Sequence, residues 1–405
     1  MNQHIMPQSA LRPSGGTQSE MIGEHASILR AQLQAMSAAL FPPSSAKTLR
    51  RFSSGEAAKI IRVSDSRLRQ LSIDGAGPQP EVTSNGRRSY SLSDIHELRA
   101  HLDEITRTTR KYQPRRGPDE HLQVISVVNF KGGSGKTTTA AHLAQSLVLR
   151  GYRVLAVDLD PQASLSVLHG VQPEMEVGSN QTLYGAIRYT DPRPLSEIIR
   201  PTYFTGLDLV PANLELMEFE HETPKALAAR RSSDQLFFAR VARALSMVED
   251  RYDVVVIDCP PQLGFLTLSA LCAATSLLIT VHPQMLDVAS MSQFLAMTDD
   301  LLSVVRDAGG AIQYDALRYL VTRYEPQDGP QTRIVALLRN LFGEAVLNAP
   351  MLKSSAVSDA GLSKQTLYEI GRESMTRSTY DRAVEALDAV NGEIEGMIRQ
   401  AWGRA

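Results

Sequence analysis

A glycine-rich loop at residues 124–139 constrains the possible fold of this chain more than any other feature. The stretch VISVVNFKGGSGKTTT begins with β-branched residues that are typical of a buried strand in a parallel sheet. Gly132, Gly133 and Gly135 then remove the Cβ atoms from a tight turn, so successive backbone N–H groups can surround a phosphate chain. A helix is expected over residues 137–150, and its N-terminus favours an anion. The stretch therefore predicts a phosphate-binding loop.

The spacing of this loop departs from the common pattern G-x-x-x-x-G-K-[ST]. Phe130 stands where the first glycine belongs, and a lysine, Lys131, lies at the head of the loop. This K-G-G-x-G-K-T form, with Asn129 before it, resembles the deviant Walker A motif of the ParA/MinD family of ATPases. The alternative is a glycine-rich turn that binds nothing. It is disfavoured because a strand pattern precedes the loop and a helix pattern follows it.

The resemblance implies that the loop binds ATP and Mg²⁺. Lys136 would hold the phosphates and the Thr137 hydroxyl would contact Mg²⁺. In this family the first lysine, here Lys131, crosses to the partner subunit and contacts its phosphates, which implies a homodimer with ATP in its interface. The residues expected to contact the nucleotide are Lys131, Gly132, Gly133, Ser134, Gly135, Lys136, Thr137 and Thr138.

Two further strand patterns end in aspartate. Residues 153–157 lead to Asp158 and Asp160 in the run DLDPQ, which matches the second motif of the family. The resemblance assigns Asp160 to positioning the attacking water and Asp158 to supporting the metal shell, although the two could simply cap the next helix. Residues 253–257 (DVVVI), apolar after Asp253, lead to Asp258 in the Walker B pattern, so Asp258 is expected to reach Mg²⁺ through water.

Strand and helix patterns alternate from residue 122 onward. Further strands are expected at 207–211, 276–281 and 317–322, and helices at 213–220, at 234–248 and from about residue 288. This alternation predicts, for residues 121–405, an α/β fold like that of P-loop NTPases, with a mostly parallel sheet and helices on both faces. The resemblance places contacts to the base in the loop after residues 276–281, where Pro283 is the candidate.

The N-terminal residues suggest two accessory segments. Residues 1–18 are polar and rich in proline and glycine, which predicts disorder. Residues 19–42 predict a helix whose apolar residues are spaced alternately by four and three, as in a coiled-coil seam. We interpret it as a dimerisation helix, the alternative being that it packs on its own chain. The seam residues are Ile22, Ala26, Leu29, Leu33, Met36 and Leu40.

Residues 48–112 have the pattern of a winged helix-turn-helix of the MerR type. A helix over 56–61, a turn and a helix capped by Ser64 are followed by an Asn-Gly hairpin and a closing helix at 93–102. Arg67 and Arg69 on the second helix would approach a DNA major groove, and Arg87 and Arg88 on the wing the adjacent backbone or minor groove. A protein-interaction domain with solvated arginines is the alternative. Residues 113–120, with two prolines and a glycine, predict a linker.

Length, cysteine content and charge limit the number of domains and the cellular compartment. The 405 residues suit two or three domains, and two cysteines are too few for a disulfide framework. Because no signal peptide or membrane span is apparent, we expect a cytoplasmic protein. Residues 1–120 hold 17 Lys and Arg against 12 Asp and Glu, whereas the whole chain carries a net charge of −2. A basic N-terminal region permits nucleic-acid binding.

Taken with the resemblance, these features predict a plasmid partition ATPase of the larger ParA kind, of the RepABC type. Such a protein would associate with the nucleoid through non-specific DNA binding, act with a centromere-binding partner of the ParB type, and repress its own operon. Two alternatives remain open. One is a membrane-positioning ATPase like MinD, because residues 379–402 form an amphipathic helix. The other is a repressor whose ATPase fold only senses nucleotide.

Overall fold

A computed structural model describes residues 21–29, 31–32, 47–82, 84, 86–107, 110–229 and 236–404. The chain forms two units, Met1–Lys47 and Thr48–Ala405. In the first unit, residues 21–29 and 31–32 are helical, and the seam residues Ile22 and Leu29 are exposed. The other residues of the expected dimerisation helix, and the expected disordered segment 1–18, lie outside the described residues. Dimerisation through this helix stays a prediction.

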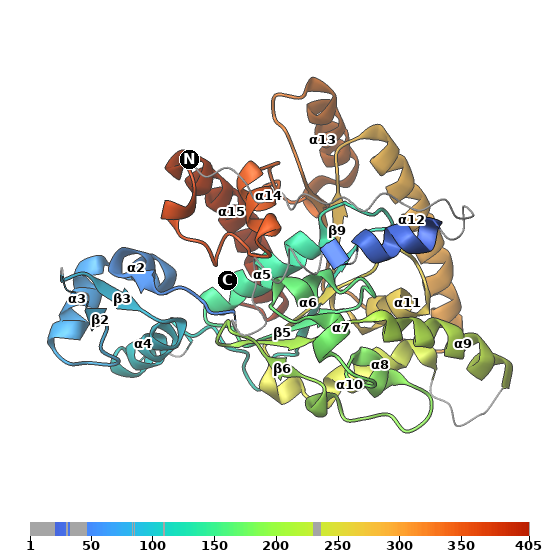
Figure 1. The fold of residues 1–405 in the computed structure, drawn as a ribbon, viewed down its shortest axis with the longest axis horizontal. Helices are drawn as coiled ribbons and strands as arrows, with labels where there is room; N and C mark the ends of the chain where they lie inside the picture. The colour runs from blue at the N-terminus through green and yellow to red at the C-terminus, as the bar shows by residue number, and fades with distance from the viewer. Residues whose placement is uncertain are drawn as a thin grey trace. The chain divides into compact units, whose positions relative to one another are not determined.

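The second unit is built on a seven-stranded sheet in the order β10-β9-β4-β8-β5-β7-β6 (Figure 1). All neighbouring pairs are parallel except β6 and β7. The expected α/β fold with a mostly parallel sheet is therefore confirmed. The strands are β4 (Gln123–Val128), β5 (Val154–Asp158), β6 (Arg200–Pro201), β7 (Leu207–Val210), β8 (Val254–Asp258), β9 (Ser276–Val281) and β10 (Ala316–Val321).

Helices cover both faces of this sheet because successive strand residues point to opposite sides. Ile125 and Val127 of β4 pack with α5, α14 and α15, whereas Val124 and Val128 pack with α8 to α13. The helices are α5 (Lys136–Leu149), α6 (Ser164–Leu168), α7 (Pro173–Glu176), α8 (Leu183–Ile187), α9 (Met217–Ala229), α10 (Arg240–Ser246), α11 (Phe265–Ala273), α12 (Met285–Asp307), α13 (Gly329–Phe342), α14 (Ser355–Leu362) and α15 (Arg377–Ala401).

The N-terminal part of the second unit contains three helices and a small antiparallel sheet in the order β1-β3-β2. Ser53 caps the first helix through a capping box, Arg62 ends it in the left-handed region, and Ser64 caps the next. The elements are β1 (Phe52–Ser53), α2 (Ser54–Ile61), α3 (Asp65–Ile73), β2 (Glu81–Val82), β3 (Arg88–Tyr90) and α4 (Leu92–Ile105). Asn85 of the expected hairpin turn lies outside the described residues, and the assignment as a winged helix-turn-helix stays a prediction.

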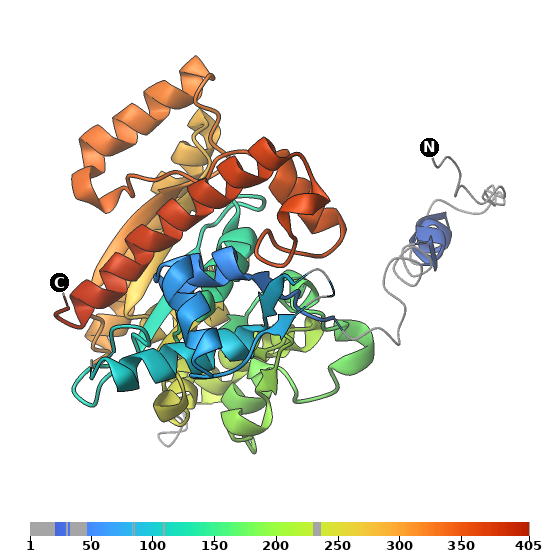
Figure 2. The ribbon, with the colours of Figure 1, turned by 90° about the vertical axis from the view of Figure 1, so that its left-hand side faces the viewer.

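Helix α15 runs across the sheet beside these N-terminal elements (Figure 2). Its apolar stripe, which includes Leu387, Val390 and Ile394, is buried in the core shared with α5. Trp402 follows the helix and donates from Nε1 to the His121 carbonyl at 2.9 Å. Burial of the stripe against the core therefore explains the amphipathic pattern of the C-terminal residues. In the described part of the chain, no helix is both long and apolar enough to cross a membrane.

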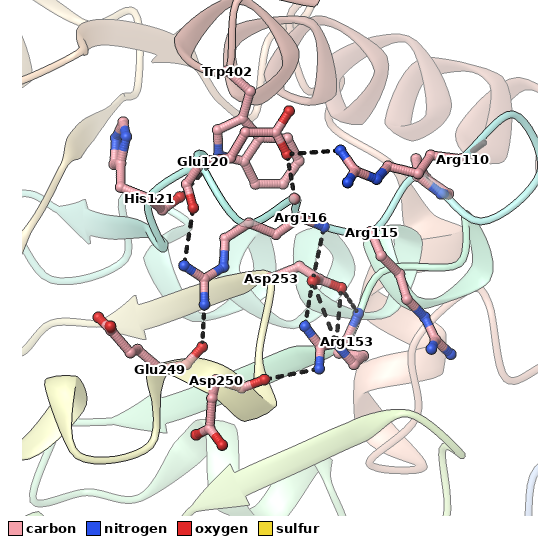
Figure 3. A network of polar contacts seen from close by, with 12 residues as sticks. Arg110, Arg115, Arg116, Glu120, His121, Arg153, Glu249, Asp250, Asp253 and Trp402 are labelled. Atoms are coloured by element: carbon pink, nitrogen blue, oxygen red, sulfur yellow. Dashed lines mark hydrogen bonds and ion pairs between the residues drawn. The ribbon is translucent and has the colours of Figure 1, made fainter.

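The expected linker, residues 113–120, contains no helix or strand but is fastened to the sheet by polar contacts (Figure 3). The Arg116 backbone N–H donates to Asp253 Oδ1 at 3.0 Å, and the Arg116 guanidinium donates to the carbonyls of Glu120 and Glu249. Asp253 is fully buried and also accepts hydrogen bonds from the Arg153 backbone and guanidinium. This segment is thus a strap held on the core of the second unit by a buried carboxylate and a backbone carbonyl.

Replacing Asp253 with alanine is expected to destabilise the protein by roughly 2–4 kcal/mol, because two backbone N–H groups and a guanidinium lose their acceptor. Urea unfolding of the full chain measures this difference. Asp250→Ala is the matched control, because Asp250 is exposed and only its carbonyl receives Arg153. Equal midpoints for the two variants would contradict the role of Asp253.

Candidate functional site

The backbone of the glycine-rich loop has the shape that the sequence predicts. The loop leaves the end of β4, and two of its glycines have positive φ, 76° at Gly133 and 88° at Gly135. A side chain would be strained at both positions. Gly135 caps α5 without a side-chain hydrogen bond, so the first N–H groups of that helix remain available to a ligand. The loop can therefore present backbone donors to a phosphate chain.

Side chains on and just after two neighbouring strands form hydrogen bonds with the loop. Thr280 of β9 bonds with Ser134, Oγ1 to Oγ at 2.9 Å. Thr322, just after β10, donates to the Ser134 carbonyl at 2.7 Å, and Arg323 donates to the Gly133 carbonyl at 3.2 Å. Ser134 is therefore buried under the loop and stabilises its shape in this structure. Its predicted contact with nucleotide would have to come from the backbone.

The two lysines of the loop have different surroundings. Lys136 is 6% exposed and donates to the Lys131 carbonyl at 3.1 Å. Burial lowers the pKa of Lys136, while the carboxylate of Asp258 opposes that shift. The Lys131 side chain is 40% exposed, and its Nζ lies 2.7 Å from Oδ2 of Asp287, a residue buried in the first turn of α12. Lys131 is therefore paired within its own chain.

The two strand-end aspartates lie side by side. Asp158 and Asp258 are register partners on the parallel strands β5 and β8, and both are fully buried. Asp158 accepts hydrogen bonds from the Ser166 backbone at 2.8 Å, the Ser166 hydroxyl at 2.7 Å and the Asp160 backbone at 3.1 Å. Both oxygens of Asp258 lack a hydrogen-bond partner among the described residues.

Burial dominates the electrostatics of this carboxylate pair. It raises the pKa of Asp158 to about 7 and the pKa of Asp258 well above its ordinary range. The charge of Asp158 raises the Asp258 pKa further, whereas the Thr137 hydroxyl and Lys136 favour the charged form. A buried carboxylate without a partner is costly, and a bound cation would lower that cost. Asp258 and Thr137 therefore fit the oxygen ligands that Mg²⁺ prefers.

The remaining predicted residues lie on the elements that carry the loop and the strand ends. Asp160 is half-buried after β5, and its Oδ1 accepts a hydrogen bond from the Gln162 backbone at 2.9 Å. Thr138 is half-buried in the first turn of α5, and Pro283 is buried after β9, the strand next to β4. Both Asp158 oxygens already have protein partners, so a part for Asp158 in the metal shell stays a prediction.

The predicted DNA-binding arginines lie on the expected elements. Arg67 and Arg69 are exposed on α3, whose buried residues are Leu68 and Leu71. Arg88 belongs to β3 and is half-buried, and Arg87 precedes it and is exposed. These four arginines belong to α3 and the β2–β3 arm, the elements that the sequence assigns to a recognition helix and a wing. Contact with DNA stays a prediction.

Among the loop contacts that sequence reasoning missed are two with charged side chains, Asp287 and Arg323. Each follows a strand at the β9–β10 edge, and the order β10-β9-β4 brings both strand ends to the loop. Asp287 had no signal of its own, because the helix that carries it was expected to begin near residue 288 and in fact begins at Met285. Arg323 has a left-handed backbone, φ 52°, which is uncommon for a residue other than glycine.

Known proteins are similar to this chain in sequence and in fold. Residues 122–307 match a family model described as an AAA domain. A protein of Rhizobium rhizogenes named "Putative replication protein A" is 57% identical over 385 residues, 95% of each chain. The chromosome partitioning protein ParA of Myxococcus xanthus is 32% identical over 237 residues, 58% of this chain and 77% of its own. A solved structure described as a partition protein has a TM-score of 0.60 at 20% identity, covering 94% of this chain and 98% of its own.

Proposed function

The chain belongs to the ParA family of partition ATPases, and we propose that it binds and hydrolyses ATP with Mg²⁺ to segregate the DNA that encodes it. The observation that carries this proposal is the proximity of Lys136, in a loop shaped for phosphate, to the buried carboxylate of Asp258, whose oxygens have no hydrogen-bond partner among the described residues. Burying the Asp258 carboxylate without a partner costs stability, so its presence indicates a role in binding a ligand rather than in folding.

The residues have complementary tasks in this proposal. The loop amides and Lys136 hold the phosphates, and Asp160 orients a water molecule toward the terminal phosphate. Thr137 and Asp258 would hold Mg²⁺, which neutralises negative charge on the phosphates when bound. Thr138 and Pro283 contribute the outer contacts to the nucleotide. Turnover is slow until DNA and a ParB-type partner stimulate it.

Lys131 gives ATP its influence on assembly. In the single chain this lysine is engaged by Asp287, so it must leave that carboxylate to reach the phosphates of a second subunit. ATP then favours the homodimer, and hydrolysis removes the ligand that favours it. The ATP-bound dimer binds DNA non-specifically through basic residues of the ATPase domain, which holds it on the nucleoid.

The oligomeric state tests this proposal directly. Light scattering after size exclusion, with and without a slowly hydrolysed ATP analogue and Mg²⁺, should show an analogue-dependent dimer. Lys136→Ala is the control, because it should prevent analogue binding and so remove the response. A mass that is unaffected by the analogue in the wild-type chain would overturn the proposal.

The N-terminal elements supply the second half of the function. We infer that α3 and the β2–β3 arm bind an operator upstream of the partition genes and repress them. The exposed Arg67 and Arg69 on α3 support this inference. The burial of the α15 stripe in the core favours this function over membrane positioning, because a membrane-binding helix needs that face free.

Replacing Arg67 and Arg69 together with alanine is expected to weaken binding to upstream DNA at least 30-fold, because each arginine contact contributes about 1–3 kcal/mol. Fluorescence anisotropy at fixed salt measures this affinity. Arg107→Ala with Arg115→Ala removes the same charge from exposed positions outside α3 and should change the affinity little. Unchanged affinity in the first pair would rule out α3 as the recognition helix.

A further inference from the structure

A small cavity with a strongly positive lining lies where the N-terminal elements meet the ATPase core. Its volume is about 260 Å³, and seven of its eleven lining residues are basic whereas one is acidic. The N-terminal elements contribute Arg62 and Arg99, and the residues between α4 and the strap contribute Arg110 and Lys111. The core contributes Arg150 from the end of α5, and Arg399 and Arg404 from the end of α15.

Three carboxylates lie near this group of cations, and all are already engaged. Asp103 accepts hydrogen bonds from the backbone N–H groups of Lys111, Tyr112 and Gln113. Glu395 Oε2 lies 3.0 Å from Arg62 and 2.5 Å from Arg150, and its Oε1 accepts the Tyr152 hydroxyl. Glu120 pairs with Arg404 at 2.7 Å and more distantly with Arg110 at 3.7 Å. The described residues around the cavity therefore carry a clear excess of positive charge.

Arg99 is the most buried of these cations. Arg99 is only 3% exposed. Its guanidinium donates to the carbonyls of Tyr112, Ile60 and Leu149 rather than to a carboxylate. Its Nε has no hydrogen-bond partner among the described residues. Burial, with the neighbouring charge of Arg62, lowers the pKa of Arg99 to about 10. A buried guanidinium without an anion is costly, and an anion in the cavity would lower that cost.

We propose that this cavity binds a small anion that carries phosphate groups, such as inorganic pyrophosphate or the phosphate end of a metabolite. Guanidinium groups match phosphate oxygens in geometry and charge. The volume lies below the roughly 300–1,000 Å³ typical of sites for drug-sized ligands, which excludes a DNA duplex and favours a compact anion. The bound anion bridges the N-terminal elements, the strap, α5 and α15, and so fastens the DNA-binding part to the core.

This site is separate from the nucleotide loop. Lys136 begins α5 and Arg150 follows its last residue, so the two ends lie about 20 Å apart at 1.5 Å per residue. The proposal therefore does not depend on ATP binding or on the partition function. It can be tested in a chain whose nucleotide loop has been disabled.

The test is calorimetric titration of inorganic pyrophosphate into the full-length Lys136→Ala protein at fixed ionic strength. One site per chain is expected. Adding Lys111→Gln and Arg399→Gln should weaken binding at least tenfold, because two cations are lost while the pairs of Glu395 and Glu120 remain. The variant Lys111→Arg with Arg399→Lys keeps both charges and should retain most of the affinity, which separates loss of charge from loss of structure.

Lys225→Gln with Arg382→Gln is the matched control, because both residues are exposed and neither lines the cavity. Its pyrophosphate affinity should equal that of the Lys136→Ala parent. The proposal is overturned if the parent binds no pyrophosphate, or if the cavity pair and the control pair bind equally. It is also overturned if the cavity pair loses affinity for a short random DNA duplex but not for pyrophosphate, since the cluster would then serve a DNA backbone.

Discussion

Replacing Lys131 with glutamine is expected to reduce DNA- and partner-stimulated ATP turnover at least 100-fold while leaving the chain folded. Lys131 is half-exposed at the head of the loop, and its ammonium pairs with Asp287 of the same chain. Its carbonyl, which receives Lys136, is kept in the variant. Glutamine can still donate a hydrogen bond to Asp287, so the chain should fold. Under the proposed function the loss falls on the contact with the phosphates of a second subunit.

Phosphate release, measured with and without DNA and a ParB-type partner, provides the rate. Lys353→Gln is the matched control, because it removes an exposed lysine that likewise pairs with a carboxylate, that of Glu325. An unchanged stimulated rate in Lys131→Gln would show that this lysine does not act across subunits.

Replacing Asp287 with asparagine breaks the same ion pair but is expected to favour the dimer rather than to reduce activity. Removing the carboxylate releases Lys131, so the analogue-induced dimer should form about fivefold more readily, which corresponds to about 1 kcal/mol for a partly exposed pair. Dimer affinity by light scattering is the measurement. A weaker dimer in Asp287→Asn would mean that Asp287 supports the assembled state rather than restraining the single chain.

Replacing Asp258 with asparagine is expected to reduce ATP turnover at least 100-fold and, at the same time, to stabilise the nucleotide-free protein at pH 8. Asp258 is fully buried, and its oxygens have no partner among the described residues. The residue therefore costs stability when ionised without a cation, and asparagine removes that charge at nearly constant shape. Activity and stability move in opposite directions because the charge serves the ligand and not the fold.

The stability difference should depend on pH. Burial raises the pKa of Asp258 in the folded protein above its ordinary value of 3.8, so the folded state binds the proton more tightly than the unfolded state. That advantage is complete below pH 3.8 and is lost as the pH rises toward the folded-state pKa. Asparagine does not ionise, so the variant does not lose stability in this way as the pH rises. The gain in melting temperature of Asp258→Asn should therefore grow from pH 4 to pH 8. A gain that shrinks with rising pH would contradict this account.

Most of the candidate site could be predicted from local sequence patterns. Gly133 and Gly135 occur where the backbone has positive φ, and Asp158 and Asp258 end neighbouring parallel strands. Such features depend on residue type and on spacing within one strand–loop–helix segment, which a sequence contains directly. The alternation of apolar strands with helices likewise predicts the layered sheet, because a parallel sheet must be covered on both faces.

Some boundaries could not be read from local pattern. The helix expected at 213–220 consists of a short turn followed by α9, which continues to Ala229 through Pro224. Of the helix expected at 234–248, residues 234 and 235 lie outside the described residues, and α10 spans Arg240–Ser246. In both places packing of Phe219 and Val241 into the core, rather than residue preference, determines where the helix lies.

The sequence alone therefore determined the phosphate loop, the strand-end carboxylates and the α/β fold, because these follow from spacing along one short stretch of chain. Tertiary structure decided the cis pairing of Lys131 with Asp287, the anchoring of the strap by Asp253 and the basic cavity around Arg99. Each of these joins residues that lie far apart in the chain, so only the order of the strands and the packing of helices on the sheet bring them together.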